Sequence, residues 1–126
     1  MAENLRSDGK AVDVTLGSAF NNVAVKKGDL IAAEGWYGIA MHDGTKGDTI
    51  AIETTQREFV LPVGSITATK GAVLYTEDLD DGKITLTASA THTSEGSTVA
   101  NIPVVKVTKA KDTNNNVWAK LLPQTV

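Results

Sequence analysis

The chain has 126 residues, enough for one domain with one hydrophobic core, and its net charge of −3 argues against a nucleic-acid-binding face. Cysteine is absent, which excludes disulfides and thiolate chemistry, and Phe, Tyr and Trp occur only twice each, so Val, Ile, Leu and Ala must fill the core. No apolar run approaches the roughly 18 residues of a membrane span, and residues 1–10 lack the apolar stretch of a signal peptide, so we expect a soluble protein made in a bacterial cytoplasm.

The first half of the chain predicts short strands after a polar start. Residues 1–10 predict a flexible N-terminal arm, and residues 11–126 predict a single β domain. In "AVDVTL" the apolar residues Val12, Val14 and Leu16 alternate with polar ones, which is typical of a half-buried strand. Further strands are predicted around 29–33 and 36–42, with a turn at Gly35, and then at "TIAIE" and "EFVLP".

The second half continues in the same way. Strands are predicted at "GAVLY" (71–75), "KITLTA" (83–88), "NIPVVKVTKA" and "VWAKLLP", and Pro103 predicts an edge position or a bulge. The polar stretch 89–98 predicts a mobile loop. Since no window shows a convincing helical period, the sequence predicts a mainly β fold: a small β-barrel or β-sandwich of short antiparallel strands with little helix.

A weak internal similarity links the two halves. "VKKGDLI" (25–31) resembles "ATKGAVL" (68–74), and each half closes with Leu-Pro, at 61–62 and 122–123. Two related half-barrels would produce this pattern. Chance similarity between short β segments would produce it equally well.

The segment 77–82, "EDLDDG", could be a calcium loop, an acidic contact surface or a turn. An EF-hand loop needs oxygen ligands at positions 1, 3 and 5, glycine at 6 and glutamate at 12. With Gly82 at position 6, Leu79 and Ala88 stand where ligands are required. "DTNNNV" (112–117) fails as well, because valine replaces the glycine. Asp-Gly between apolar runs is a strong hairpin signal, so we predict a solvated turn and no metal site.

No other motif predicts chemistry. "GTKGDT" (44–49) lacks the Gly-Lys-Ser/Thr of a phosphate-binding loop and leads into a predicted strand rather than a helix. His42 and His92 are the two histidines, and neither has a nucleophile elbow nearby. The sequence therefore predicts no catalytic residue, no cofactor and no enzyme activity.

Three aromatic residues are candidates for an interface. Trp36 and Tyr37 are adjacent, so on a strand they point to opposite faces, and we expect one of them in the core and the other partly exposed. Trp118 is a further candidate, because aromatic residues are enriched at protein interfaces. For each of the three, packing at the edge of the core is the alternative.

Several segments follow one order and spacing from about Asp8 to Leu122: "VKKGDLI", "WYGIAMHDGTKGDTIAIETTQREFVLP" and "TKGAVLYTEDLDDGKITLT". In this order they resemble the capsid cement family of tailed bacteriophages, formerly a phage domain of unknown function. The shared features are Gly28-Asp29, the strand 38–40 with the turn at 47–48, and "GAVLY" before an acidic turn. The chain departs from the family at "EGWYGIA", which carries two bulky aromatics, and at Pro103.

The resemblance implies a structural protein on the outer surface of the virion head. Such a protein binds the major capsid protein after the shell expands, stabilises the capsid, and forms homotrimers at three-fold and quasi-three-fold positions, with no nucleic-acid or membrane partner. We expect the arm to contact the capsid through Ala2, Glu3, Asn4, Leu5 and Arg6. The alternative is a phage-encoded β-barrel hydrolase or carbohydrate-binding module, since β folds also carry such sites.

Overall fold

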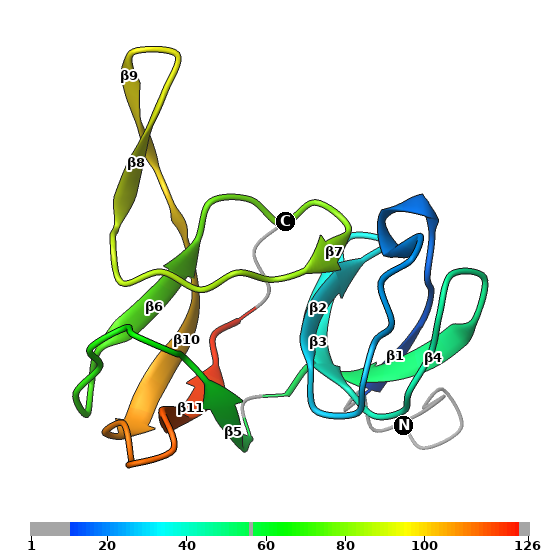
Figure 1. Cartoon of the computed structure of the whole chain (residues 1–126), viewed down its shortest axis with the longest axis horizontal. Helices are drawn as coiled ribbons and strands as arrows, with labels where there is room; N and C mark the ends of the chain where they lie inside the picture. Colours follow the sequence, from blue (N-terminus) through cyan, green and yellow to red (C-terminus); the bar gives the residue numbers. More distant parts are fainter. Residues whose placement is uncertain (1–10, 56, 124–126) are drawn as a thin grey trace, which may run out of the picture.

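Two antiparallel sheets and a projecting hairpin form the protein (Figure 1). The computed structural model describes residues 11–55 and 57–123. The first sheet has the order β1-β4-β3-β2-β7 and consists of β1 (Ala11–Thr15), β2 (Leu30–Ala33), β3 (Trp36–Ala40), β4 (Thr49–Glu53) and β7 (Gly82–Lys83). The second has the order β5-β11-β10-β6 and consists of β5 (Glu58–Pro62), β6 (Val73–Thr76), β10 (Ile102–Lys109) and β11 (Asn116–Leu121). The hairpin pairs β8 (Thr91–Ser94) with β9 (Ser97–Ala100).

The prediction of a mainly β fold with antiparallel strands and little helix is confirmed. Helical structure in the described residues is limited to one turn of 3-10 helix at Ser18–Phe20. No helix in this part of the chain is long and apolar enough to cross a membrane.

The strand β2, "LIAA", is buried along its whole length because its two faces pack on two different cores. Leu30 and Ala32 join one hydrophobic cluster, and Ile31 and Ala33 join the other. This explains why β2 is a continuous apolar run, whereas β1 at the edge of the same sheet alternates apolar and polar residues.

The smaller core lies on one side of the five-stranded sheet. It contains the inward-facing residues of β1 to β4 together with Leu16, Phe20 and Val25 from the connections. The sheet curls so that its β2–β3 turn approaches β1, where a carboxylate oxygen of Glu34 accepts a hydrogen bond from the amide of Thr15. This contact occupies a backbone donor at the edge of the sheet, where amides lack a strand partner.

The larger core joins the two sheets. Leu30, Ala32, Tyr37 and Ile39 from the five-stranded sheet pack in one cluster with the buried residues of β5, β6, β10 and β11. Those residues include Leu61, Leu74, Val104, Val105, Val107, Val117, Ala119 and Leu121. The sheets are therefore held together by aliphatic packing, as the scarcity of Phe, Tyr and Trp required.

One Lys-Gly turn is built in the same way at three places. It spans 26–29, 45–48 and 69–72, and its glycines Gly28, Gly47 and Gly71 have φ of +96°, +94° and +90°. In each turn the backbone amide of the fourth residue donates a hydrogen bond to the carbonyl oxygen of the first residue, with a nitrogen–oxygen distance of 2.9 to 3.0 Å. A positive φ at the third position is the mark of a type II turn, which favours glycine there. Two of these turns are the similar segments at 25–31 and 68–74, so that similarity corresponds to one recurring turn structure.

Two predictions about the second half are wrong. Asp81-Gly82 does not close a tight hairpin: β6 pairs with β10, β7 pairs with β2, and the acidic segment crosses from one sheet to the other. Its two flanks meet only in one isolated antiparallel bridge, between Tyr75 and Thr87. Residues 89–98 are not a loop but mostly the β8–β9 hairpin, whose turn residues Glu95 and Gly96 both have positive φ. The bulge expected at Pro103 is confirmed, since the register of β10 against β6 shifts between Pro103 and Val105.

Candidate protein-interaction surface

The residues predicted to bind the capsid, Ala2 to Arg6, lie outside the described residues. The described chain begins at β1, which is an edge strand of the five-stranded sheet. Residues 1–10, which were predicted to form an arm, precede this edge strand in the sequence, and an exposed sheet edge is a place where an added strand can pair.

The adjacent aromatics at the start of β3 separate into one exposed and one buried residue. Trp36 is 42% exposed beside the β2–β3 turn, whereas Tyr37 is 1% exposed in the larger core. The hydroxyl of Tyr37 donates to the carbonyl oxygens of Leu122 at 2.9 Å and Pro123 at 3.2 Å, which fixes the chain after β11 against β3. Burial raises the pKa of Tyr37. Trp36 thus remains an interface candidate, and Tyr37 belongs to the core.

Trp118 lies on the outer face of the four-stranded sheet. It is 39% exposed, and its partner across the strand pair is Val60 on β5, which is 51% exposed. On its other side the ammonium of Lys109 lies 5.1 Å from the centre of the Trp118 ring, within reach of a cation–π interaction. Two large, partly exposed apolar side chains therefore lie side by side on the outer face of β5 and β11.

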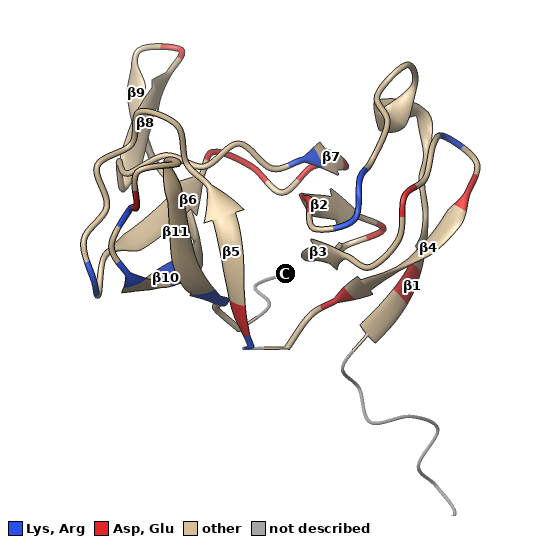
Figure 2. Cartoon of the chain, turned by 60° about the horizontal axis from the view of Figure 1, so that its bottom comes forward, with Lys and Arg blue, Asp and Glu red and all other residues tan. Residues whose placement is uncertain are grey.

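Lysines surround this apolar pair. Lys106 and Lys120 are exposed and lie directly opposite each other on β10 and β11. With Lys70 they line a shallow groove of about 390 Å³. The acid on this face is Glu58, which accepts a hydrogen bond from the hydroxyl of Thr108. We call this surface the lysine–tryptophan face; it consists of Val60, Lys70, Lys106, Lys109, Trp118 and Lys120, and Figure 2 shows its basic positions in blue on β10 and β11.

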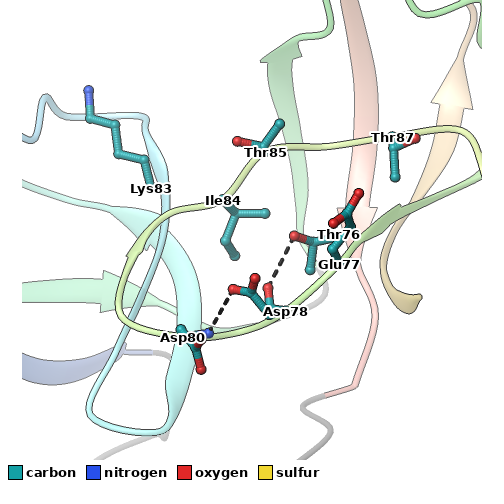
Figure 3. Close-up of a pocket in the computed structure, with 8 residues that line it drawn as sticks. All are labelled: Thr76, Glu77, Asp78, Asp80, Lys83, Ile84, Thr85 and Thr87. Atoms are coloured by element: carbon teal, nitrogen blue, oxygen red, sulfur yellow. Dashed lines mark hydrogen bonds between the residues drawn. The ribbon is translucent and has the colours of Figure 1, made fainter. Parts of the chain in front are cut away.

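A second charged surface is the acidic loop, Glu77–Asp81, which crosses between the sheets (Figure 3). Its four carboxylate residues are all exposed. Within the loop, Asp78 accepts from the amide of Asp80 at 3.2 Å, and the hydroxyl of Thr76 donates to the Asp78 carbonyl at 3.1 Å. These bonds shape the loop backbone, and Asp81 accepts a hydrogen bond from the amide of Glu34 at 3.2 Å, which ties the end of the loop to the β2–β3 turn. The loop borders a pocket of about 410 Å³, from which the side chain of Lys83 points away in Figure 3 to pair with Asp29 at 3.0 Å.

The histidines lie apart. His92, at the base of the β8–β9 hairpin, shares a hydrogen bond with the side chain of Asn101, and its Nε2 lies 4.0 Å from Glu77. His42 is exposed, and its neighbour Asp43 accepts from the amide of Lys27 at 2.8 Å instead of orienting the imidazole. Among residues 11–55 and 57–123, no group of three or more His, Asp or Glu side chains is placed to hold a metal ion.

Comparison with protein-family models, with curated proteins and with solved structures found no match.

Reasoning from the sequence found Trp118 but missed the lysines around it. Lys106 and Lys120 occupy polar positions in strands that otherwise alternate with buried valine, alanine and leucine. That alternation places each lysine on the outer face, but their pairing depends on the register between β10 and β11. The register of the two strands was not readable from either strand alone.

Proposed function

We propose that this chain is a capsid decoration protein, or cement, of a tailed bacteriophage. It binds the outer surface of the expanded head and stabilises the shell by bridging neighbouring subunits of the major capsid protein. It acts as a homotrimer at three-fold and quasi-three-fold positions, and it is a structural protein of the virion rather than an enzyme.

The observation that carries the proposal is the presence of two separate elements suited to protein contact. One is the lysine–tryptophan face, where exposed Trp118 and Val60 provide the kind of apolar centre found in interfaces and the lysines provide a charged rim. The other is β1, an edge strand that directly follows the arm. A bridging protein needs at least two such contacts, and the resemblance of the ordered segments to the cement family supports the same role.

The bridging mechanism follows from the physics of repeated weak contacts. An arm that becomes ordered on binding loses conformational entropy, so a single arm binds weakly. Joining three copies makes the second and third arms bind at high effective concentration, so the trimer binds far more tightly than one chain. The shell gains stiffness because each trimer spans several capsid subunits.

Co-sedimentation with purified expanded phage heads tests the proposal. We expect the full chain to pellet with the heads at a saturable stoichiometry, and a variant lacking residues 2–10 to stay in the supernatant while keeping the circular dichroism of the full chain. A full chain that stays in the supernatant, with retention on or cleavage of a host polysaccharide, would favour the carbohydrate-binding module or hydrolase instead.

A further inference from the structure

The lysines of the lysine–tryptophan face form no ion pair with an acidic side chain in the described part of the chain. Lys106 and Lys120 are opposed across β10 and β11, where like charges destabilise a sheet. Neither of them, nor Lys70, forms an ion pair with another described residue, whereas Lys83 and Arg57 each pair with a carboxylate at 3.0 and 2.9 Å. The face thus carries four lysines and one carboxylate, that of Glu58, which lies opposite Lys120 across β5 and β11 and accepts a hydrogen bond from Thr108, so positive charge is in excess on it.

The acidic loop has the complementary property. Glu77, Asp78, Asp80 and Asp81 are exposed on one short segment. The Nε2 of His92 lies 4.0 Å from the carboxylate of Glu77, and Lys83 is engaged with Asp29. In Figure 2 the red acidic loop lies at the crossover towards β7, away from the blue positions on β10 and β11. No ion pair among the described residues joins the two surfaces, and their opposite charges make them complementary between chains.

We propose that the lysine–tryptophan face binds the acidic loop of a second copy of this chain. The ammonium groups of Lys70, Lys106 and Lys120 face the carboxylates of the neighbour's loop, and Trp118 with Val60 supplies the apolar contact area beside them. The inference deepens the proposed function, on whose trimeric state it rests, by naming the two surfaces that meet. It leaves the arm and β1 free for the capsid.

The geometry of such a contact constrains the assembly. Two different surfaces can meet twice in a two-fold dimer, or head to tail, where each copy offers its face to one neighbour and its loop to the other; the three-fold position of the proposed function selects the second, heterologous arrangement. A heterologous contact closes as a ring or continues as an open filament, and three copies related by a three-fold axis form the smallest ring that fits a three-fold position. The other occupant this face could take is an acidic segment of the capsid protein, which the experiment below distinguishes.

Charge exchange tests the contact in the isolated full-length protein by sedimentation velocity across a concentration series. One variant is Lys106→Glu/Lys120→Glu, a second is Glu77→Lys/Asp80→Lys, and a third combines all four substitutions. The matched control for the first variant is Lys26→Glu/Lys46→Glu, which makes the same change in net charge as that variant but on exposed turns of the other sheet. Circular dichroism confirms that each variant keeps its fold.

We expect the wild-type chain and the control to associate to a trimer with rising concentration, more strongly at low ionic strength. Each two-residue reversal should weaken association by at least about tenfold, and the four-residue exchange should restore it, because the charges are again complementary. The proposal is overturned if the wild type stays monomeric throughout, if Lys106→Glu/Lys120→Glu associates like the wild type, or if the folded four-residue exchange fails to recover.

Binding of the same proteins to expanded heads separates this inference from the proposed function. If the wild-type protein associates with itself but does not bind heads, the proposed self-contact is supported and the proposed cement function is contradicted. Head binding lost in Lys106→Glu/Lys120→Glu, with self-association unchanged, would assign the face to the capsid and overturn the self-contact.

Discussion

Replacing Gly38 by alanine should strongly destabilise the protein, because β3 has no room for a methyl group. A Cβ at this position would lie 2.3 Å from the carbonyl oxygen of Glu53 and 3.0 Å from its carbonyl carbon. Both atoms belong to the backbone of the neighbouring strand β4, so no side-chain rotation relieves the clash. The strands β3 and β4 must move apart to make room for the methyl group. Because both hydrophobic cores pack against this sheet, the movement disturbs their packing, and we expect the free energy of unfolding to fall by about 1 to 3 kcal/mol.

Urea titration and thermal denaturation followed by circular dichroism measure this loss. For a chain of this length each kcal/mol corresponds to about 4 °C in Tm, so Gly38→Ala should melt about 4 to 12 °C below the wild type. Gly17→Ala is the matched control: Gly17 has φ of −90° and no atom within 4 Å of an added Cβ, so its stability should stay close to that of the wild type. A Gly38→Ala variant as stable as Gly17→Ala would refute the close packing of β3 against β4.

Three further predictions concern the core tyrosine, the exposed tryptophan and the acidic loop. Tyr37→Phe removes the hydroxyl that donates to Leu122, so the free energy of unfolding should fall by about 1 kcal/mol in a urea titration at pH 7. Burial raises the pKa of Tyr37, so the neutral hydroxyl stabilises the fold below pH about 10, and this stabilisation is lost as the pH rises further. The difference in free energy of unfolding between the wild type and Tyr37→Phe should therefore shrink above pH about 10. A difference that stays unchanged above that pH would contradict the prediction. Trp118→Ala should lower trimer affinity by at least about tenfold with little change in Tm, and unaltered sedimentation would count against the tryptophan as an interface anchor. Asp78→Asn/Asp80→Asn should leave the urea midpoint nearly unchanged, since both side chains are exposed; a clear drop in the midpoint would show that the loop carries structural charge contacts.

The strands that could be predicted from the sequence are those with a local signal. In β1 and β4, apolar residues alternate with polar ones over a full strand, and both strands formed where predicted. The segments at 26–29 and 69–72 gave a second local signal, since a glycine with positive φ defines the turn before β2 and before β6. Alternation and turn chemistry act within a few residues, so they are visible without the rest of the fold.

The incorrect predictions in the second half of the chain arose because pairing between distant strands decided the local structure. Asp81-Gly82 has the composition of a hairpin turn, but Gly82 has φ of +143°, outside the left-handed region that the tight hairpin turn requires at that residue. Pairing of β6 with β10 and of β7 with β2 prevailed over the local preference, and such long-range pairing is invisible in a short window.

The candidate site was only partly predictable for the same reason. Trp118 was predicted as an interface candidate because it is aromatic. The adjacency of Trp36 and Tyr37 indicated that one of the two would be buried, and Tyr37 is the buried one. The lysine–tryptophan face as a whole depends on the register of β11 against both β5 and β10, which brings Val60, Trp118 and Lys109 together. Its composition is therefore a property of the assembled sheet rather than of any one segment.

The most direct test of the decoration role is co-sedimentation of the full-length protein with expanded and with unexpanded phage heads. We expect saturable binding to expanded heads, in a multiple of three copies per three-fold position, and loss of binding when residues 2–10 are removed. Equal binding to both kinds of head, or none to either, would contradict it.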